Sequence, residues 1–303
     1  MSLPKIEIIL VNWNNYDDSV QCLESIKHCT YQNREITVVD NGSDGNDSQL
    51  LAEKFGDDIR IIENEKNLGF AKGCNVGIRD ALARDADYIV LLNNDTIVAP
   101  DFLDGLVRVL QGDGEVGIAG GKILCHEYPD LIWSAGGTID YRTGSTPMRG
   151  SGEVDDGQYD KTTEVDWVCS CFMVVSRDVL EDVGLFDERF FFGWEDADLC
   201  VRATQKGHRV IYIPGSVVWH KGFGEEKKER LKGKPLYYAT RGHFIFIGKH
   251  FNRKQILSSA LHFITRFPKA MWDYSRITGQ WIGPMYMFRA VFDYIRMLLK
   301  KRR

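Results

Sequence analysis

Short apolar runs alternate with segments of helical spacing over the first half of the chain. The runs that predict strands are 6–11, 36–39, 59–62, 88–92 and 116–120. The segments between them that predict helices are 17–28, 48–55, 71–84 and 100–110. Strands that alternate with helices form a mainly parallel sheet with helices on its faces, so the pattern predicts an α/β fold.

The second half of the chain is less regular. Segment 126–163 is rich in Gly, Asp and Tyr and has weak periodicity, which predicts hairpins and loops. Beyond it we expect a strand at 165–176, a helix at 195–206 and a strand at 209–213 that leads to Trp219-His220. From Lys234 onward the pattern is helical with many aromatic residues, so it predicts a helical C-terminal extension.

The charge of the chain is divided unevenly. Residues 252–303 carry eleven Lys or Arg and two Asp or Glu, a net charge of +9, whereas residues 1–251 carry a net charge of −14. Segment 289–300 places its polar residues on one narrow helical stripe beside a broad apolar face. This amphipathic, basic tail predicts contact with an anionic membrane surface. The alternatives are packing on the body of the protein and an interface in a homodimer. Nucleic acid is not expected, because the body is acidic and carries no recognised binding motif.

Localisation is predicted from two further features. The sequence has no run of about eighteen apolar residues and its first residues lack the apolar segment of a secretory signal. Its seven cysteines are scattered and odd in number, which is typical of free thiols in a reducing compartment. We therefore expect a cytoplasmic protein, peripheral at the cytoplasmic face of the membrane.

Polar residues follow two of the predicted strands. In sheets of this kind, ligands bind at the carboxyl ends of the strands, where Asp40 and Asp95 are expected to lie. A carboxylate at the tip of a strand can accept a hydrogen bond from a ring N–H of a nucleobase, although Asp40-Asn41-Gly42-Ser43 also has the composition of an ordinary turn. Asp95 can hold Mg²⁺ or Mn²⁺ together with substrate phosphates, or it can serve only as a loop residue.

Two further segments carry candidate chemistry. Glu195 and Asp196 open a predicted helix behind aromatic residues that include Phe192 and Trp194. Acidic residues are common in a first helical turn, but a carboxylate beside a partly dry aromatic floor can also act as a general base on an acceptor hydroxyl. His220 follows a strand, so it is a further candidate metal ligand, although a lone histidine is more often structural.

Taken together, these segments resemble glycosyltransferase family 2, whose members have the GT-A fold, a Rossmann-like α/β arrangement. The resemblance covers roughly Lys5 to Gly222 and is most similar to the rhamnosyltransferase-type members. It is carried by Val11-Asn12-Trp13-Asn14, Val39-Asp40-Asn41-Gly42-Ser43, Asn67-Leu68-Gly69-Phe70-Ala71-Lys72-Gly73-Cys74-Asn75, Leu92-Asn93-Asn94-Asp95 and Trp194-Glu195-Asp196-Ala197-Asp198-Leu199. It implies a catalytic domain over 1–230, with a donor-binding half at about 1–122 and an acceptor half at about 123–230, and an extension over 231–303.

The resemblance also implies the roles of individual residues. The residues implied for the nucleotide sugar are Asn12, Asn14, Asp40, Asn41, Gly69, Phe70, Lys72, Asn75, Asn94 and Asp95. Asp95 and His220 would hold the metal, Mn²⁺ or Mg²⁺, and Asn93 stands at the first position of the family's Asp-x-Asp motif. Asp196, with Glu195 beside it, would be the catalytic base. Trp194, Phe192 and Asp198 would form the acceptor and sugar pocket.

The implied activity is a metal-dependent, inverting transfer of a hexose from a nucleotide sugar to a hydroxyl group in the synthesis of a cell-surface polysaccharide. The first expected donor is dTDP-rhamnose, and a UDP-linked galactofuranose, N-acetylglucosamine or other hexose is the alternative. The acceptor is expected to be a glycan or a polyprenyl-diphosphate-linked sugar. Two readings from other classes remain open, an inactive scaffold that binds nucleotide sugars and a hydrolase that uses Asp95 and Asp196. A dinucleotide-dependent oxidoreductase is excluded, because Asn12-Trp13-Asn14-Asn15 replaces the glycine-rich turn after the first strand.

Overall fold

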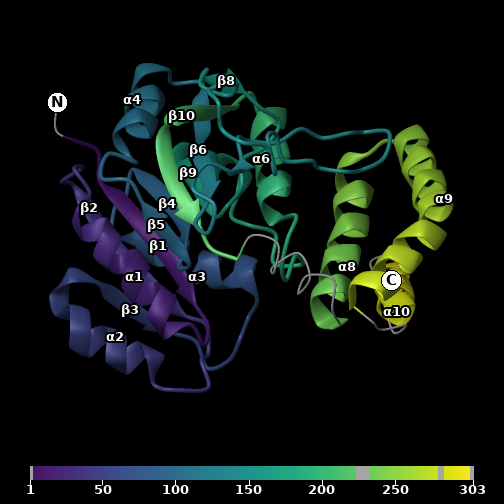
Figure 1. The fold of residues 1–303 in the computed structure, drawn as a ribbon, viewed down its shortest axis with the longest axis horizontal. Helices are drawn as coiled ribbons and strands as arrows, with labels where there is room; N and C mark the ends of the chain where they lie inside the picture. Colours follow the sequence, from purple (N-terminus) through teal and green to yellow (C-terminus); the bar gives the residue numbers. More distant parts are fainter. Residues whose placement is uncertain (1–2, 223–232, 279–282, 301–303) are drawn as a thin grey trace.

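The computed structural model describes residues 3–222, 233–278 and 283–300, and it has an α/β core with three further helices at its C-terminal end (Figure 1). The strands are β1 (Ile6–Asn12), β2 (Arg34–Asp40), β3 (Arg60–Glu63), β4 (Tyr88–Asn93), β5 (Thr96–Val98), β6 (Val116–Cys125), β7 (Ile132–Ser134), β8 (Thr163–Glu164), β9 (Phe172–Ser176) and β10 (Arg209–His220). The helices are α1 (Tyr16–Lys27), α2 (Asp47–Phe55), α3 (Phe70–Ala83), α4 (Asp104–Gly112), α5 (Arg177–Val183), α6 (Glu195–Gln205), α8 (Gly233–His250), α9 (Arg253–Thr278) and α10 (Gly283–Lys300). The predicted domain boundary near residue 230 and the charges of residues 301–303 lie outside the described residues.

One sheet unites the core, in the order β3-β2-β1-β4-β9-β6-β10-β5. Strands β3, β2, β1 and β4 are parallel, as the alternating pattern predicts. Strand β9 runs antiparallel to both of its neighbours, β4 and β6, so the complete sheet is mixed. Because β6 and β10 are parallel to each other, the carboxyl ends of β1, β2, β4, β6 and β10 all point to one edge of the sheet. That edge is where the candidate site residues gather.

Two apolar layers cover the sheet. On one face, Ile6, Ile8 and Leu10 of β1 pack with α1, α2 and α4. On the other face, Ile9 and Val39 pack with α3, α5 and α6, and the same layer includes Phe246 of α8. The alternate residues of β1 therefore serve opposite layers, which is the period-two arrangement of a strand covered on both faces.

Several predicted elements differ in extent from the observed ones. The apolar segment 165–176 forms a strand only over Phe172–Ser176, and the residues before it are irregular because they turn toward the site. Strand β6 continues to Cys125, and β10 continues to His220 across an irregular register between Ile213 and Val217. The helix expected from residue 100 begins at Asp104.

The C-terminal helices lie beside the sheet on one side of the molecule (Figure 1). A loop that begins at Tyr141 reaches from the core to α9, where Ser259 Oγ donates to the Thr143 carbonyl at 2.8 Å. The helices α8 and α10 approach closely, since a Cβ on Gly248 would lie 1.9 Å from Tyr294 Oη. Among the described helices, none is long and apolar enough to span a bilayer.

Candidate active site

The ends of β1 and β2 form a rigid polar corner. Asn12 is fully buried, and its Nδ2 donates to Asp40 Oδ2 at 2.9 Å while its Oδ1 accepts from Ser19 Oγ at 2.8 Å. Ser43 donates to both oxygens of Asp40, from its backbone nitrogen at 2.9 Å and from Oγ at 2.8 Å. Asn14 lies beside this corner, bound to Asp44. The carboxylate of Asp40 is therefore held in one orientation, and its reading of a nucleobase stays a prediction.

A cavity of about 730 Å³ opens beside this corner. It is lined by Val11, Trp13, Asn15, Asn41, Asn67, Gly69, Phe70, Asn93, Asn94, Asp95, Phe191, Phe192, Lys234, Pro235 and Tyr238. Its walls come from the ends of β1, β2 and β4, from the loop before α3 and from the first turns of α8. Of the ten residues expected at the nucleotide sugar, the cavity brings together five, which are Asn41, Gly69, Phe70, Asn94 and Asp95. We call it the donor cavity.

Backbone contacts fix the wall that carries Gly69. Gly69 has a φ of +85°, and a Cβ there would lie 2.6 Å from the Phe191 carbonyl oxygen, so only glycine fits. The Phe70 nitrogen donates to that same oxygen at 2.8 Å. The Phe191 ring stacks on Tyr238 of α8, with centroids 4.1 Å apart. The helix α8 thus covers one side of the donor cavity, although it lies outside the segment that carries the family resemblance.

Asp95, which lines the donor cavity, lies beside His220 at the end of β10. His220 Nε2 lies 3.3 Å from Asp95 Oδ1 and 3.1 Å from Asn93 Nδ2, and the ring packs on Trp133 at 4.3 Å. Asp95 Oδ1 and His220 Nδ1 are buried and make no hydrogen bond. The carboxylate of Asp95 and the ring nitrogen Nε2 of His220 that faces it are ligand types that suit a divalent cation, which would take its other ligands from phosphate and water. Within the described residues, no three such side chains form a complete metal site.

A second cavity, of about 270 Å³, adjoins the donor cavity and shares Phe70, Asn93, Phe192 and Pro235 with it. Its other lining residues are Trp133, Thr146, Met148, Trp167, Cys169, Ser170, Cys171, Gly193, Trp194, Glu195, Asp196, His220 and Ala239. It therefore contains the expected base, its acidic neighbour and both expected aromatic residues. We call it the acceptor cavity.

Asp196 is held at the first turn of α6. Its side chain accepts from the Ser170 nitrogen at 3.3 Å and from the Ala197 nitrogen at 2.8 Å, and 9% of the residue is exposed. These two N–H groups hold the carboxylate in one orientation at the start of the helix. Trp194, just before the helix, has a φ of +79° and donates from Nε1 to the Ala239 carbonyl of α8 at 3.0 Å. This left-handed backbone costs energy in a bulky residue, so the contact with α8 helps to hold the tryptophan in the cavity wall.

Asp198 does not lie in the acceptor cavity, which corrects the expectation from the sequence. It is fully buried on the side of α6 that faces α8, where it is bound by Arg202 at 2.8 Å, Lys249 at 2.7 Å and His250 at 2.7 Å. Burial would raise its pKa, but the hydrogen bond from His250 and the charges of Arg202 and Lys249 outweigh this effect and hold the pKa below its usual value. Asp198 fastens α8 to α6.

Two further residues expected at the diphosphate also lie elsewhere. Asn75 is buried and exchanges two hydrogen bonds with the backbone of Phe186, at 2.9 and 3.0 Å. The ammonium group of Lys72 lies 3.5 Å from Glu188. Neither residue lines the donor cavity, and Asn75 connects α3 to the loop that carries the aromatic residues. Lys234 of α8, by contrast, lines the donor cavity, and nothing in the strand-end pattern indicates it.

We expect Asp198→Asn to lower the free energy of unfolding by about 3 kcal/mol, because it removes the charge of the buried carboxylate that Arg202, Lys249 and His250 share. Urea denaturation at pH 7 measures the effect. Asp182→Asn is the matched control, since Asp182 pairs with Lys206 at the surface, and it should cost less than about 1 kcal/mol. Equal, small losses in the two variants would contradict the role of Asp198.

The ion pairs of Asp198 also predict that the stability of the protein depends on pH. The pKa of Asp198 in the folded protein is below its value in the unfolded chain, so the unfolded chain binds the proton more readily. The stabilisation is complete above the unfolded pKa of about 4 and is lost as the pH falls toward the folded value. Denaturation curves between pH 7 and pH 3 should show a steeper loss for the wild type than for Asp198→Asn.

Comparisons with known proteins identify the family of the chain. The family model described as glycosyltransferase like family 2 matches residues 4–234. A dTDP-rhamnosyl transferase of Shigella flexneri, RfbF, is 26% identical over 262 residues, with 81% of this chain and 80% of that protein covered. A poly-beta-1,6-N-acetyl-D-glucosamine synthase of Staphylococcus aureus is 22% identical over 254 residues, and these cover 82% of this chain but only 57% of that protein.

Solved structures share the fold. GalNAc-T7, crystallised with UDP, GalNAc and Mn²⁺, superposes with a TM-score of 0.69 at 13% identity, covering 96% of this chain and 57% of that one. The mannosyltransferase PcManGT of Pyrobaculum calidifontis, in complex with GDP-Man and Mn²⁺, gives a TM-score of 0.58 at 16% identity, covering 97% of this chain and 88% of that one. The fold is therefore GT-A, as the resemblance implies, and the chain belongs to glycosyltransferase family 2.

Proposed function

We propose that the protein transfers a sugar from a nucleoside-diphosphate donor to an acceptor hydroxyl with inversion at the anomeric carbon. The observation that carries this proposal is the pair of adjoining cavities. Asp95 lies in the donor cavity and Asp196 in the acceptor cavity, and Phe70, Asn93 and Phe192 line both. A leaving group and a base in adjoining cavities suit a single displacement, in which the acceptor attacks opposite the departing diphosphate.

The residues around the reacting centre have separate tasks. Asp196, oriented by the nitrogens of Ser170 and Ala197, accepts the proton of the attacking hydroxyl. Trp194 and Phe192 restrict water, which limits hydrolysis of the donor. Lys234 places a positive charge in the donor cavity, where it can bind the diphosphate.

Asp95 and His220 would hold the divalent cation, Mn²⁺ or Mg²⁺, because the carboxylate and the ring nitrogen Nε2 lie 3.3 Å apart and are both ligand types that such a cation accepts. When it is bound, such a cation supplies Lewis-acid neutralisation of charge on the leaving diphosphate. Asn93 occupies the position of a second carboxylate, so the protein contributes one negative charge and the substrate must supply the rest.

The first donor that we propose is dTDP-rhamnose, supported by the similarity to RfbF. A UDP-linked hexose is the alternative, supported by the similarity to the N-acetylglucosamine polymer synthase. The test is a transfer assay with both donor classes and sugar acceptors, followed by NMR of the new linkage. A product whose anomeric configuration is opposite to that of the donor supports the proposal, and a product with retained configuration contradicts the single displacement. Binding of donor without transfer to any acceptor would favour an inactive scaffold.

We also propose that the C-terminal helices lie on an anionic membrane surface at the cytoplasmic face. Two of these helices, α9 and α10, carry exposed apolar side chains. They include Leu257, Leu261 and Ile264 on α9 and Met285, Phe288, Phe292 and Ile295 on α10. Basic residues such as Lys254 and Arg296 are exposed on the same helices. Broad apolar faces with adjacent positive charge favour the interface of anionic lipid.

We expect the protein to sediment with vesicles that contain phosphatidylglycerol, and to do so less at high salt. Replacing Leu261 and Phe292 together with serine should release it, because both side chains are more than 60% exposed and would otherwise enter the interface. Light scattering of the wild type and of this variant measures their oligomeric state, and so tests the alternative that this face is an interface in a homodimer. Vesicle binding that the double variant retains, or a dimer that it dissociates, would contradict a membrane contact through this face.

A further inference from the structure

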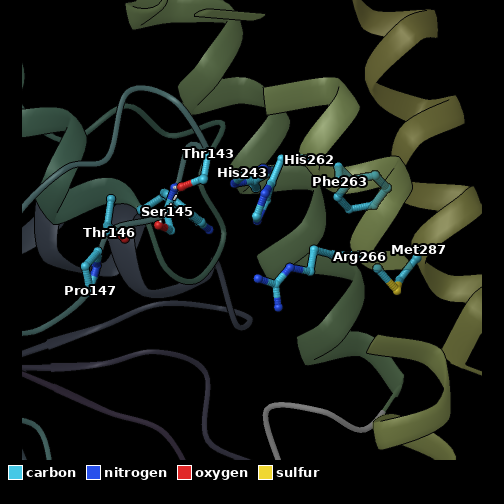
Figure 2. Close-up of a pocket in the computed structure, with 10 residues that line it drawn as sticks. Thr143, Ser145, Thr146, Pro147, His243, His262, Phe263, Arg266 and Met287 are labelled. Carbon is cyan, nitrogen blue, oxygen red and sulfur yellow. Dashed lines mark hydrogen bonds between the residues drawn. The ribbon is translucent and has the colours of Figure 1, made fainter. Parts of the chain in front are cut away.

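A third cavity lies between the core and the C-terminal helices (Figure 2). It has a volume of about 420 Å³ and shares Trp194 and Thr146 with the acceptor cavity. Its far side is formed by Phe263 and Arg266 of α9 and by Met287 of α10. A ligand in this cavity would therefore lie directly beside the cavity that contains Asp196.

The walls of the third cavity are built by close contacts between segments distant in sequence. A Cβ on Gly144 would lie 2.7 Å from Ile247 and 2.8 Å from Ser259, so the loop passes tightly between α8 and α9. On the other side, a Cβ on Gly242 would lie 2.7 Å from Trp194. The loop, the tryptophan and the two helices are thus fitted to one another, and the cavity is part of the packed structure.

Most polar groups in the walls are already engaged. Thr143 and Ser145 hydrogen-bond to each other at 2.8 Å, and Trp194 Nε1 is bound to the Ala239 carbonyl. Burial, with a smaller contribution from His262, lowers the pKa of His243 to about 4, so this ring carries no charge at neutral pH. Such walls offer little to the many hydroxyl groups of a sugar, and they suit an apolar ligand.

Arg266 is the exception in this lining. Figure 2 shows its side chain reaching from α9 into the space in front of the loop that carries Ser145 and Thr146. Among the residues that the structure describes, none forms an ion pair or a hydrogen bond with its guanidinium group. Guanidinium matches phosphate oxygens in a two-pronged hydrogen bond, so the cavity combines apolar walls with one anion-binding group.

We propose that the third cavity binds the phosphate-bearing start of an apolar chain to which the acceptor sugar is attached. Arg266 binds the phosphate, Phe263 and Met287 contact the first carbons of the chain, and the sugar extends past Trp194 to Asp196. The inference rests on the proposed function and deepens it, since it assigns a lipid-phosphate acceptor in place of a free glycan. The rest of the chain would leave along the exposed apolar faces of α9 and α10.

Farnesyl diphosphate, below its micellar concentration, is the probe, and binding is followed by tryptophan fluorescence with the donor cavity saturated by nucleoside diphosphate and Mn²⁺. Farnesol and inorganic pyrophosphate are the comparison ligands, since each carries one half of the chemistry. We expect farnesyl diphosphate to bind at least about tenfold more tightly than either, because only it engages both Arg266 and the apolar walls. Equal affinity for farnesyl diphosphate and pyrophosphate would overturn the proposal.

Two variants test the anion-binding group and the apolar wall of the third cavity separately. Arg266→Gln should remove the advantage of farnesyl diphosphate over farnesol, whereas Met287→Gln should weaken both. Lys161→Gln, an exposed change of charge in the loop before β8, should alter neither. Nucleotide binding is measured in every variant and should not change. If the wild type binds no nucleotide, the proposed function itself fails, but if it binds nucleotide and Arg266→Gln has no effect on farnesyl diphosphate, only this inference fails.

Discussion

Asp196→Asn is expected to reduce the rate of sugar transfer by about 10²–10⁴-fold, the range that a positioned general base contributes. The amide keeps the volume of the carboxylate but cannot accept the proton of the acceptor hydroxyl. Because Asp196 lines the acceptor cavity and not the donor cavity, the affinity for nucleoside diphosphate should stay within about twofold of the wild-type value. Steady-state kinetics measures the loss of transfer rate, and nucleotide titration measures the unchanged affinity.

The matched control for this change is Asp130→Asn, which alters an exposed carboxylate in the loop after β6. It should leave the transfer rate unchanged. If only Asp196→Asn lowers the rate, the loss is caused by the change in the acceptor cavity and not by the removal of one negative charge from the protein. A melting temperature near that of the wild type excludes unfolding as the cause. Full transfer by Asp196→Asn would contradict the mechanism, and Glu195 would then be the next candidate base.

Asp95→Asn is expected to abolish the effect of Mn²⁺ on nucleotide affinity and to lower transfer by about 10²–10³-fold, since neutralisation of a leaving diphosphate is worth several kcal/mol. His220 alone supplies no negative charge to replace that of the carboxylate. Titrations of nucleoside diphosphate with and without Mn²⁺ should give two different affinities for the wild type and a single one for the variant.

Asp101→Asn serves as the control for Asp95→Asn, because Asp101 is an exposed carboxylate a few residues further along the chain. It should retain the response to Mn²⁺. The assignment of the cation to Asp95 and His220 would be wrong if Asp95→Asn kept a full response to Mn²⁺.

The edge of the sheet that carries the site could be predicted because strand ends are local features. Asn12, Asp40 and Asn93 each follow an apolar run, and parallel strands bring such positions to one edge. The direction of β9 was not visible in the same way, because an apolar run has the same pattern in a parallel and in an antiparallel strand. The sheet is therefore more mixed than the alternation predicts.

Side-chain direction explains why Asp198 was misplaced. Residues two positions apart on a helix point to nearly opposite sides, so Asp196 facing the cavity requires Asp198 to face away, toward α8. The motif places both residues in one acidic cluster, and only the helix geometry separates them.

The contribution of α8 depends on packing between distant segments. Lys234 and Tyr238 enter the donor cavity because Asp198, Trp194 and Phe191 hold this helix against the core. Helical periodicity predicts that α8 exists, but it does not say which surface the helix meets. The sequence therefore predicts the helical extension, and the structure adds that α8 forms part of the wall of the donor cavity.

The most direct test of the account is the thermal stability of the wild-type protein with dTDP, UDP, GDP and ADP, each with and without Mn²⁺. A ligand that binds only the folded state must raise the melting temperature, by about 5 °C at a hundredfold excess over Kd. We predict such a shift with dTDP or UDP, and only when Mn²⁺ is present. No shift with any of the four nucleotides would contradict a donor site in the cavity that contains Asp95.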